Sequence, residues 1–175
     1  MTDRIDRLRQ IYGSPSESSS DKVKNILSNE IITFINNSPF VVLASSDSDG
    51  NCDASPRGGL PGFVKVVDEK TLFVPDIKGN RLFQSFGNFG SNPKAGLIFF
   101  IPGNNKMVRV NGRVSIVEKG KVMETIGHIE VAWKDENSEL IQGFILKVDE
   151  AYSHCPRALH FSDLWNSETI ESNRK

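Results

Sequence analysis

The stretch from Ala54 to Arg113 alternates short apolar runs with short polar segments that contain glycine and basic residues. The runs Phe63–Val67, Thr71–Val74 and Ala95–Ile101 are rich in β-branched and aromatic residues and are bounded by Gly, Pro, Asp and Asn, which is typical of β-strands. Basic residues and glycines therefore recur at predicted strand ends. In an all-β or α+β domain, a phosphate-bearing ligand would lie there.

Short turn sequences connect consecutive predicted strands, and such short connections predict antiparallel hairpins. Asp47-Ser48-Asp49-Gly50 predicts one turn and Asp68-Glu69-Lys70 another. Helical spacing of apolar residues appears at 80–89 and 119–128, and 134–139 reads as a polar loop. No repeat and no doubly wound βαβ pattern is present in the sequence, so we expect a mainly β (α+β) fold, a small antiparallel barrel with helices at its ends. The predicted strands are 40–45, 51–55, 64–67, 71–74, 95–101, 107–117 and 140–148, with 129–133 as a frayed addition.

The N-terminal part predicts helices. Apolar residues at helical spacing indicate a short amphipathic helix at 3–12 and two more segments at 23–27 and 31–35, with Asn29 as the N-cap of the last. Pro39 ends this region because the residue before a proline is pushed out of the helical conformation. We expect residues 1–38 to form a helical arm and residues 39–175 the barrel domain.

Asn111-Gly112 is compatible with a hairpin turn or with a strand that continues through it. A hairpin here would have very short arms and would crowd Arg109 and Arg113 at its tip. We therefore predict one long strand, with a glycine where another segment approaches closely.

Composition excludes several classes of protein. At 175 residues the chain fits one domain, and its formal charge of −1 gives no overall attraction to nucleic acid or membrane. Cys52 and Cys155 are too few for a disulfide framework, and we expect both to be reduced. The charged N-terminus lacks the apolar segment of a signal peptide, and no apolar run is long enough for a membrane helix, so the expected location is the cytoplasm.

Lys78-Gly79-Asn80-Arg81 has the features of a phosphate site. The motif comes at the start of the predicted helix 80–89, where backbone N–H groups and the helix dipole favour an anion. Gly79 would let the backbone approach closely, and Arg81 could add a bidentate contact. The alternative is a solvated turn followed by a capped helix.

Two further segments could contact a ligand. In Ser55-Pro56-Arg57-Gly58, the proline removes a ladder donor, which indicates an edge strand or bulge whose free backbone groups could bond a planar heterocycle. Arg109, Asn111 and Arg113 alternate on one face of their strand and would make it narrow and positive. The alternative for the first segment is a plain strand end, and the alternative for the second is a solvated strand face.

The C-terminal segment is unusually rich in aromatic and reactive residues for a terminus. It contains Tyr152, His154, Cys155, Arg157, His160, Phe161 and Trp165, and we expect it to dock on another surface. With three histidines, none at ligand spacing, we predict no metal site, and a Cys-His nucleophile is disfavoured. A wall of a ligand pocket or a subunit contact fits these residues better.

The chain resembles the pyridoxamine 5'-phosphate oxidase-like superfamily, the FMN-binding split barrels, and in particular a subgroup of probable FMN-dependent enzymes. The resemblance covers about residues 22 to 166, and it rests on the order of the motifs rather than on any one of them. The motifs are Ser38-Pro39-Phe40-Val41-Val42-Leu43-Ala44, Ser55-Pro56-Arg57-Gly58, Pro61-Gly62-Phe63, Gly79-Asn80-Arg81, Asn92-Pro93, Pro102-Gly103, Arg109-Val110-Asn111-Gly112-Arg113 and His154-Cys155-Pro156.

The resemblance implies a six- to seven-stranded antiparallel split β-barrel that forms a homodimer, with two FMN sites at the subunit interface. The residues it assigns to FMN are Lys78, Gly79, Asn80 and Arg81 at the phosphate, Ser55, Pro56, Arg57 and Gly58 at the ring, Met107, Arg109 and Asn111 across the interface, and His154, Arg157 and Trp165 closing the pocket from the partner. Gly59 stands where the subgroup usually has an acidic residue, and His160-Phe161-Ser162 where it has an Arg-Ser pair.

Three functions agree with these features, and none assigns a catalytic residue. The first is an FMN-dependent oxidoreductase for an unidentified small substrate near Arg57 and His154, where Arg57 would favour an anion. The second is a binding protein that holds FMN or another phosphorylated cofactor without turnover. The third is a split barrel that uses a deazaflavin or haem, because a fold does not fix its function.

Overall fold

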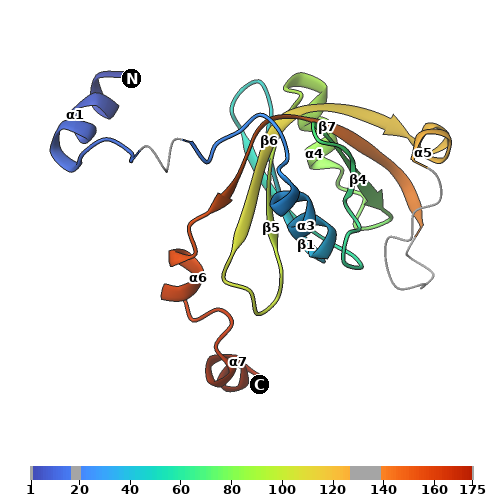
Figure 1. Ribbon diagram of the computed structural model, residues 1–175. Helices are drawn as coiled ribbons and strands as arrows, with labels where there is room; N and C mark the ends of the chain where they lie inside the picture. The colour runs from blue at the N-terminus through green and yellow to red at the C-terminus, as the bar shows by residue number, and fades with distance from the viewer. Residues whose placement is uncertain (1, 17–20, 127–138, 175) are drawn as a thin grey trace.

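The computed structural model describes residues 2–16, 21–126 and 139–174, and over these residues the strands form one seven-stranded antiparallel sheet (Figure 1). Its order is β2-β1-β5-β6-β7-β4-β3, with β2 and β3 at the edges. The sheet does not close, which confirms the predicted mainly β split barrel with flanking helices. The strands are β1 (Phe40–Ser46), β2 (Cys52–Gly58), β3 (Lys65–Asp68), β4 (Thr71–Ile77), β5 (Lys94–Phe100), β6 (Met107–Glu118) and β7 (Leu140–His154).

Both predicted hairpins are present. β1 pairs with β2, and the Asp47 carboxylate shapes the turn between them by accepting hydrogen bonds from the N–H groups of Asp49 and Asn51 at 3.0 and 2.9 Å. β3 pairs with β4 through a shorter turn than predicted. Local turn chemistry thus accounts for both connections.

β6 is one long strand that pairs with β5 on one side and β7 on the other, as predicted. Its register with β7 shifts between Asn111 and Gly112. A Cβ atom on Gly112 would overlap the carbonyl oxygen of Lys147 and come within 2.8 Å of the Leu146 side chain. The glycine therefore lets two strands approach closely at a bulge, which explains why Asn-Gly does not form a turn here.

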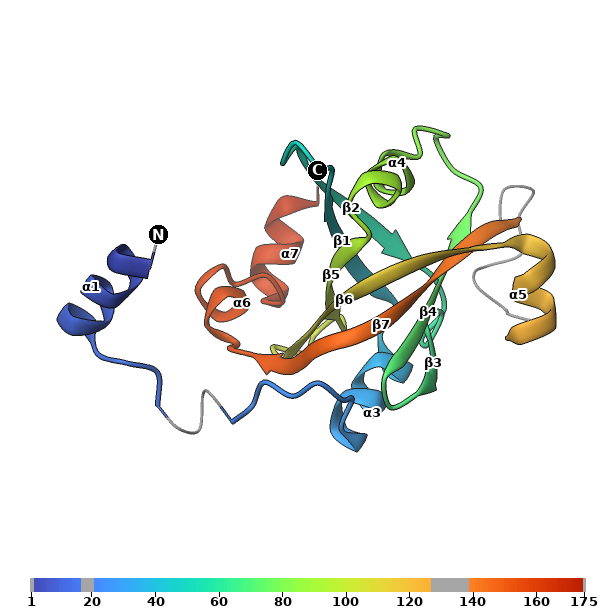
Figure 2. The same ribbon diagram turned by 90° about the horizontal axis from the view of Figure 1, so that it is seen from above.

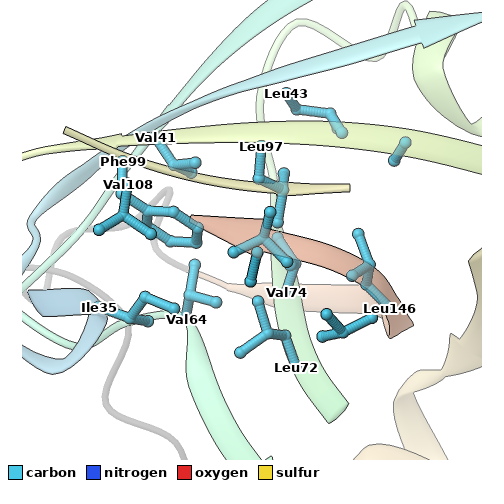
Figure 3. Packing of buried hydrophobic residues seen from close by; sticks show 14 of the residues in the cluster. Ile35, Val41, Leu43, Val64, Leu72, Val74, Leu97, Phe99, Val108 and Leu146 are labelled. Atoms are coloured by element: carbon cyan, nitrogen blue, oxygen red, sulfur yellow. The ribbon is translucent and has the colours of Figure 1, made fainter. Parts of the chain in front are cut away.

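The core lies inside the curved sheet, where buried apolar side chains pack against one another (Figure 3), and two helices contribute to it. Alternating residues of β1 and β5, such as Leu43 and Leu97, are fully buried. The helix α3 (Asn29–Asn37) adds Ile31 and Ile35, and the helix α4 (Gln84–Ser91) adds Phe89, whose ring lies 5.1 Å from that of Phe144.

Five predictions about the helices and strands are wrong. The strand predicted at 71–74 continues to Ile77 as β4. Residues 23–27 are not helical, because Lys24 exchanges backbone hydrogen bonds with Ala151 at 3.2 and 2.7 Å and Leu27 donates to Glu69. The N-cap of α3 is Ser28, not Asn29, and its side chain accepts from the N–H of Ile31. The helix predicted to start at residue 80 begins at Gln84. β7 continues beyond Val148 to His154 because β6 is long enough to pair with it throughout.

The ends of the chain extend away from the sheet (Figures 1 and 2). The predicted first helix is present as α1 (Thr2–Tyr12), and its Ile11 and Tyr12 are exposed. After β7 come α6 (Arg157–Phe161) and α7 (Ser167–Asn173), where Phe161 is 70% exposed. The helix α5 (Lys119–Thr125) follows β6, while the predicted end of that helix, the frayed strand 129–133 and nearly all of the predicted loop 134–139 lie outside the described residues.

Candidate functional site

A cleft lies where residues 55–58 of the edge strand β2 face residues 75–77 of β4, a place that we call the seam. It consists of two adjoining hollows that share the lining residues Ser55, Arg57, Ile77, Gly79 and Asn80. The smaller hollow has a volume of about 100 Å³ and reaches the start of α4. The larger has a volume of about 330 Å³ and extends over Pro56, Gly58 and Phe63. The seam thus brings the Ser55–Gly58 and Gly79–Arg81 motifs together.

β2 supplies one wall of the cleft. Because side chains alternate along a strand, Ser55 and Arg57 point to the opposite face from Pro56 and Gly58, which are exposed. Pro56 has no N–H group to donate, and β2 is an edge strand, so the proline is tolerated where the sequence predicts it.

Arg57 crosses the seam and forms an ion pair with Asp76 of β4. Asp76 is only 5% exposed, and its second oxygen accepts a hydrogen bond from Gln142 Nε2 at 3.3 Å. Nε of Arg57 is buried and has no hydrogen-bond partner among the described residues. The cleft therefore contains a buried donor that a ligand could satisfy.

Two hydroxyl groups line the smaller hollow. Ser85 Oγ, on α4, donates to Asp53 Oδ2 at 2.8 Å, and Ser55 Oγ donates to the same oxygen at 3.1 Å. No motif in the sequence pointed to Asp53, Asp76 or Ser85. Strand alternation places Asp53 on the face of Ser55 and Arg57 and could have revealed it, but the contacts of Asp76 and Ser85 cross between distant segments.

The loop that carries the predicted phosphate motif forms the other wall. Asn80 accepts a hydrogen bond from the N–H of Leu82 at 3.0 Å, and Arg81 lines the smaller hollow. Arg81 and Phe83 have positive φ angles of 63° and 51°, so the loop cannot be the helical turn that was predicted. Such left-handed non-glycine residues often mark functional loops.

Lys78 is exposed and is absent from the lining of both hollows. It lies near Glu139, whose pKa is lowered by the hydrogen bond and charge of Lys119 and, to a smaller extent, by the charge of Lys78. The structure therefore places Gly79, Asn80 and Arg81 on the cleft but not Lys78.

The predicted residues of β6 lie elsewhere. Met107 is buried, Arg109 donates to the Tyr152 hydroxyl at 3.2 Å, and Asn111 donates to Glu150. Arg113 pairs with Asp149 at 2.9 Å. The face predicted to be positive is therefore partly neutralised by two carboxylates of β7.

The remaining predicted residues belong to the end of β7 and to the C-terminal arm. His154 stacks on Tyr152, and its Nδ1 is buried without a hydrogen-bond partner in the described part of the chain. The Arg157 guanidinium lies 4.9 Å from the centre of the Phe161 ring. Trp165 Nε1 is likewise buried and unpartnered within the described ranges.

One chain does not bring the two sets of predicted residues together. Gly58, Phe40, Phe100, Met107 and His154 are successive partners across five strands, so Gly58 and His154 stand at the two ends of one row. Four strand spacings of about 4.8 Å put them about 19 Å apart along the sheet.

Among the described residues, the other reactive groups form neither a disulfide nor a metal-ligand cluster. Cys52 and Cys155 are free and exposed. Within the described ranges, no three His, Cys, Asp or Glu side chains cluster as metal ligands would, and no helix has the length and apolar character to cross a membrane.

Comparisons with known proteins concern the family and the fold of the chain. The family model described as pyridoxamine 5'-phosphate oxidase matches residues 15–155. Among the curated proteins, no match to the chain was found.

Three solved structures share the fold. A candidate pyridoxamine 5'-phosphate oxidase from Lactobacillus delbrueckii is 21% identical, with a TM-score of 0.55 over 74% of this chain and 95% of that one. HupZ from Group A Streptococcus is 18% identical, with a TM-score of 0.52 over 72% and 92%. An FMN-binding protein from Syntrophomonas wolfei is 9% identical, with a TM-score of 0.52 over 87% and 97%. At these identities the likeness concerns the fold alone.

Proposed function

Since the chain belongs to the pyridoxamine 5'-phosphate oxidase family, we propose that it binds FMN at the seam and acts as an FMN-dependent oxidoreductase on a small substrate. The observation that carries the proposal is the cleft itself, in which a loop suited to phosphate meets a strand suited to a flat ring. The fold neighbour from Syntrophomonas wolfei is an FMN-binding protein, which agrees with this choice of cofactor.

The residues at the seam fit the two ends of FMN. The smaller hollow combines Arg81 with the first turn of α4, whose N–H groups have no partners within the helix and favour an anion. The larger hollow lies along Ser55–Gly58, and its volume falls within the usual range for ligand pockets. We therefore assign the phosphate to the loop and the ring to β2.

FMN would supply the electron transfer, as a bound flavin does in other enzymes. The side chains of this protein would position it. Arg81 and Asn80 would orient the phosphate, and the buried Nε–H of Arg57 would donate to an acceptor atom of the ligand. Phe63, which is 2% exposed, would provide an apolar, water-excluding wall.

We also propose that the functional unit is a homodimer. His154 stands at the far end of the row from Gly58, and a second copy that contributes His154 to the cleft would bring the two sets of predicted residues to one ligand. The outer face of the sheet carries Phe40, which is 38% exposed, beside the partly buried Val42, Ile98 and Phe100. An apolar face of this kind is suited to a subunit contact.

Subunit complementation tests the shared site. Arg81→Ala and Trp165→Ala change the two halves of the shared site, so both sites of either homodimer would bind FMN about tenfold more weakly and would lose it during purification. A mixed dimer would contain one site with both changes and one site with neither, and would bind one FMN. Chains with different affinity tags allow the mixed species to be purified and its flavin content measured. Mixed dimers without FMN would mean that each site is made by a single chain.

Absorbance of the purified protein tests the cofactor. We expect a flavin spectrum and release of FMN on heating, whereas a deazaflavin or haem would give a different spectrum. Protein that is colourless and does not bind added FMN would refute the proposal.

One observation favours a second function, that of a flavin carrier or sensor without turnover. Among the described residues that line the two hollows, the one carboxylate is Asp76, and it is already paired with Arg57. These lining residues therefore include no free acid-base pair that could transfer a proton. Rapid reduction of the bound flavin by NADH, NADPH or a substrate would support the oxidoreductase, and reduction by dithionite alone would support the carrier.

A further inference from the structure

The Arg57–Asp76 pair connects β2 and β4, two strands that do not pair with each other in the sheet. β2 is the first strand in the sheet order, and β4 lies at the other end, next to β3. Arg57 reaches from β2 to Asp76 on β4 across the opening of the barrel. A side-chain contact thus connects the seam where the described sheet has no backbone ladder.

Arg57 and Asp76 are both largely buried, which favours their staying paired. The Asp76 side chain is 7% exposed and that of Arg57 is 20% exposed. A buried carboxylate stays charged only when it is paired and hydrogen-bonded, and both oxygens of Asp76 have partners, in Arg57 and Gln142. The pair as a whole therefore carries no net charge into the cleft.

The pair leaves one donor of Arg57 for a ligand. Nε is buried and unpartnered among the described residues, although Arg57 lines both hollows. The guanidinium is planar and holds its five N–H groups in fixed directions. When one of its nitrogens pairs with Asp76, the directions of the remaining N–H groups are therefore fixed as well. A hydrogen-bond acceptor on the ligand would satisfy the buried Nε–H.

We propose that Asp76 is a positioning residue that fixes Arg57 so that it offers the ligand a directed N–H donor without a net positive charge. The inference rests on the proposed flavin function and concerns the uncharged part of the ligand, a heterocycle or polyol with an acceptor atom. It replaces the expectation that Arg57 attracts an anionic substrate. Attraction for the phosphate then comes from Arg81 and the start of α4.

Two variants and two probes test the proposal. Arg57→Lys keeps a cation that can pair with Asp76 but lacks the Nε–H group, and Asp76→Asn keeps the shape of the side chain but leaves Arg57 with an uncompensated charge. Riboflavin probes the part of FMN without phosphate, through quenching of its fluorescence. Inorganic phosphate, as a competitor of FMN, probes the other end.

The two probes should respond in different ways. In Arg57→Lys, riboflavin should bind about tenfold more weakly, as expected for loss of one charge-assisted hydrogen bond, and phosphate should bind as in the wild type. In Asp76→Asn, riboflavin should again bind about tenfold more weakly. Phosphate should bind more tightly in this variant, with a stronger dependence on salt, because Arg57 would now present its charge.

If the pair were purely structural, Asp76→Asn would lower the affinity for riboflavin and for phosphate together. Both affinities would then fall in step with the urea midpoint of unfolding. That result, or unchanged riboflavin affinity in Arg57→Lys, would overturn the inference. If Asp76→Asn does not fold, Asp76→Glu takes its place, because it keeps the charge but moves the carboxylate. It should bind riboflavin more weakly and phosphate as in the wild type, and unchanged riboflavin affinity would overturn the inference. Wild-type protein that binds neither FMN nor riboflavin would instead refute the proposed function, and the inference with it.

Discussion

Replacing Arg81 by alanine tests the phosphate assignment most directly. Arg81 lines the smaller hollow from an exposed loop, so its contact with a phosphate would be charge-assisted but partly screened by solvent. A hydrogen bond to a charged group contributes about 1.5–3 kcal/mol, and exposure favours the lower value. A loss of about 1.5 kcal/mol corresponds to a dissociation constant for FMN that is about tenfold higher.

The assay is a titration of flavin fluorescence with FMN and with riboflavin. Riboflavin lacks the phosphate, so its affinity should stay the same in Arg81→Ala. Lys78→Ala is the matched control, because Lys78 belongs to the same loop but does not line the cleft, and it should bind FMN almost as the wild type does.

Arg81→Gly separates binding from backbone strain. Arg81 has a φ of 63°, which costs a non-glycine residue about 1–2 kcal/mol relative to glycine. Arg81→Gly should therefore be more stable than Arg81→Ala by about 1 kcal/mol and should lose the same affinity for FMN. Equal losses for FMN and riboflavin in Arg81→Ala, or no loss for FMN, would contradict the assignment.

Three further predictions concern the scaffold. Gly112→Ala should destabilise the fold by about 3 kcal/mol in urea unfolding, because its Cβ would overlap the Lys147 carbonyl oxygen, whereas Gly87→Ala, with nothing within 4 Å, should be neutral or slightly stabilising. Phe144→Ala should cost about 3–5 kcal/mol in the same assay, because this side chain is 1% exposed and packs against two rings of α4. The pKa of Asp47 lies below 3.8, mainly because the Asn51 side chain and backbone N–H donate to it, so its stabilisation is present above that pH and is lost as the pH falls through the lower folded pKa. Asp47→Asn should remove this part of the acid dependence of the melting temperature, and an unchanged acid dependence would contradict it.

The strands and hairpins could be predicted because their signals are local. Asp47 and Gly50 mark the β1–β2 turn within a few residues, and the apolar run of β5 is long enough to be recognised alone. The bulge at Gly112 could also be predicted, because a glycine inside a strand suggests a close approach.

The errors arose where tertiary contacts overrode a local pattern. The apolar spacing of Leu82 and Phe83 predicts a helical face, yet Leu82 is 65% exposed and Phe83 has a left-handed backbone. Val23 and Ile26 also have helical spacing, but the backbone bonds of Lys24 and Leu27 to other strands fix an extended path. Propensity is a weak prior when such bonds are available.

Asp76 could not be predicted from the sequence because its role depends on the contact between β4 and β2 at the seam. Asp76 belongs to a strand whose other residues are nearly all buried, so the sequence gives no reason to single it out. Its role follows from the packing of β4 against the opposite edge of the sheet, through a partner 19 positions away. Contacts of this kind are set by the curvature and packing of the whole sheet rather than by any local segment.

The incomplete closure of the barrel gives a physical reason for the position of the site. A closed barrel satisfies every strand edge, whereas here β2 remains an edge with unpaired backbone groups, and its Pro56 removes one donor from it. Side chains cover the opening only in part, through the pair of Arg57 and Asp76, and the cleft remains on either side of it. A flat ligand that accepts hydrogen bonds along β2 would therefore complete an edge that the chain leaves open. Filling the seam should then stabilise the fold by an amount that grows with ligand concentration, as for any ligand that binds only the native state.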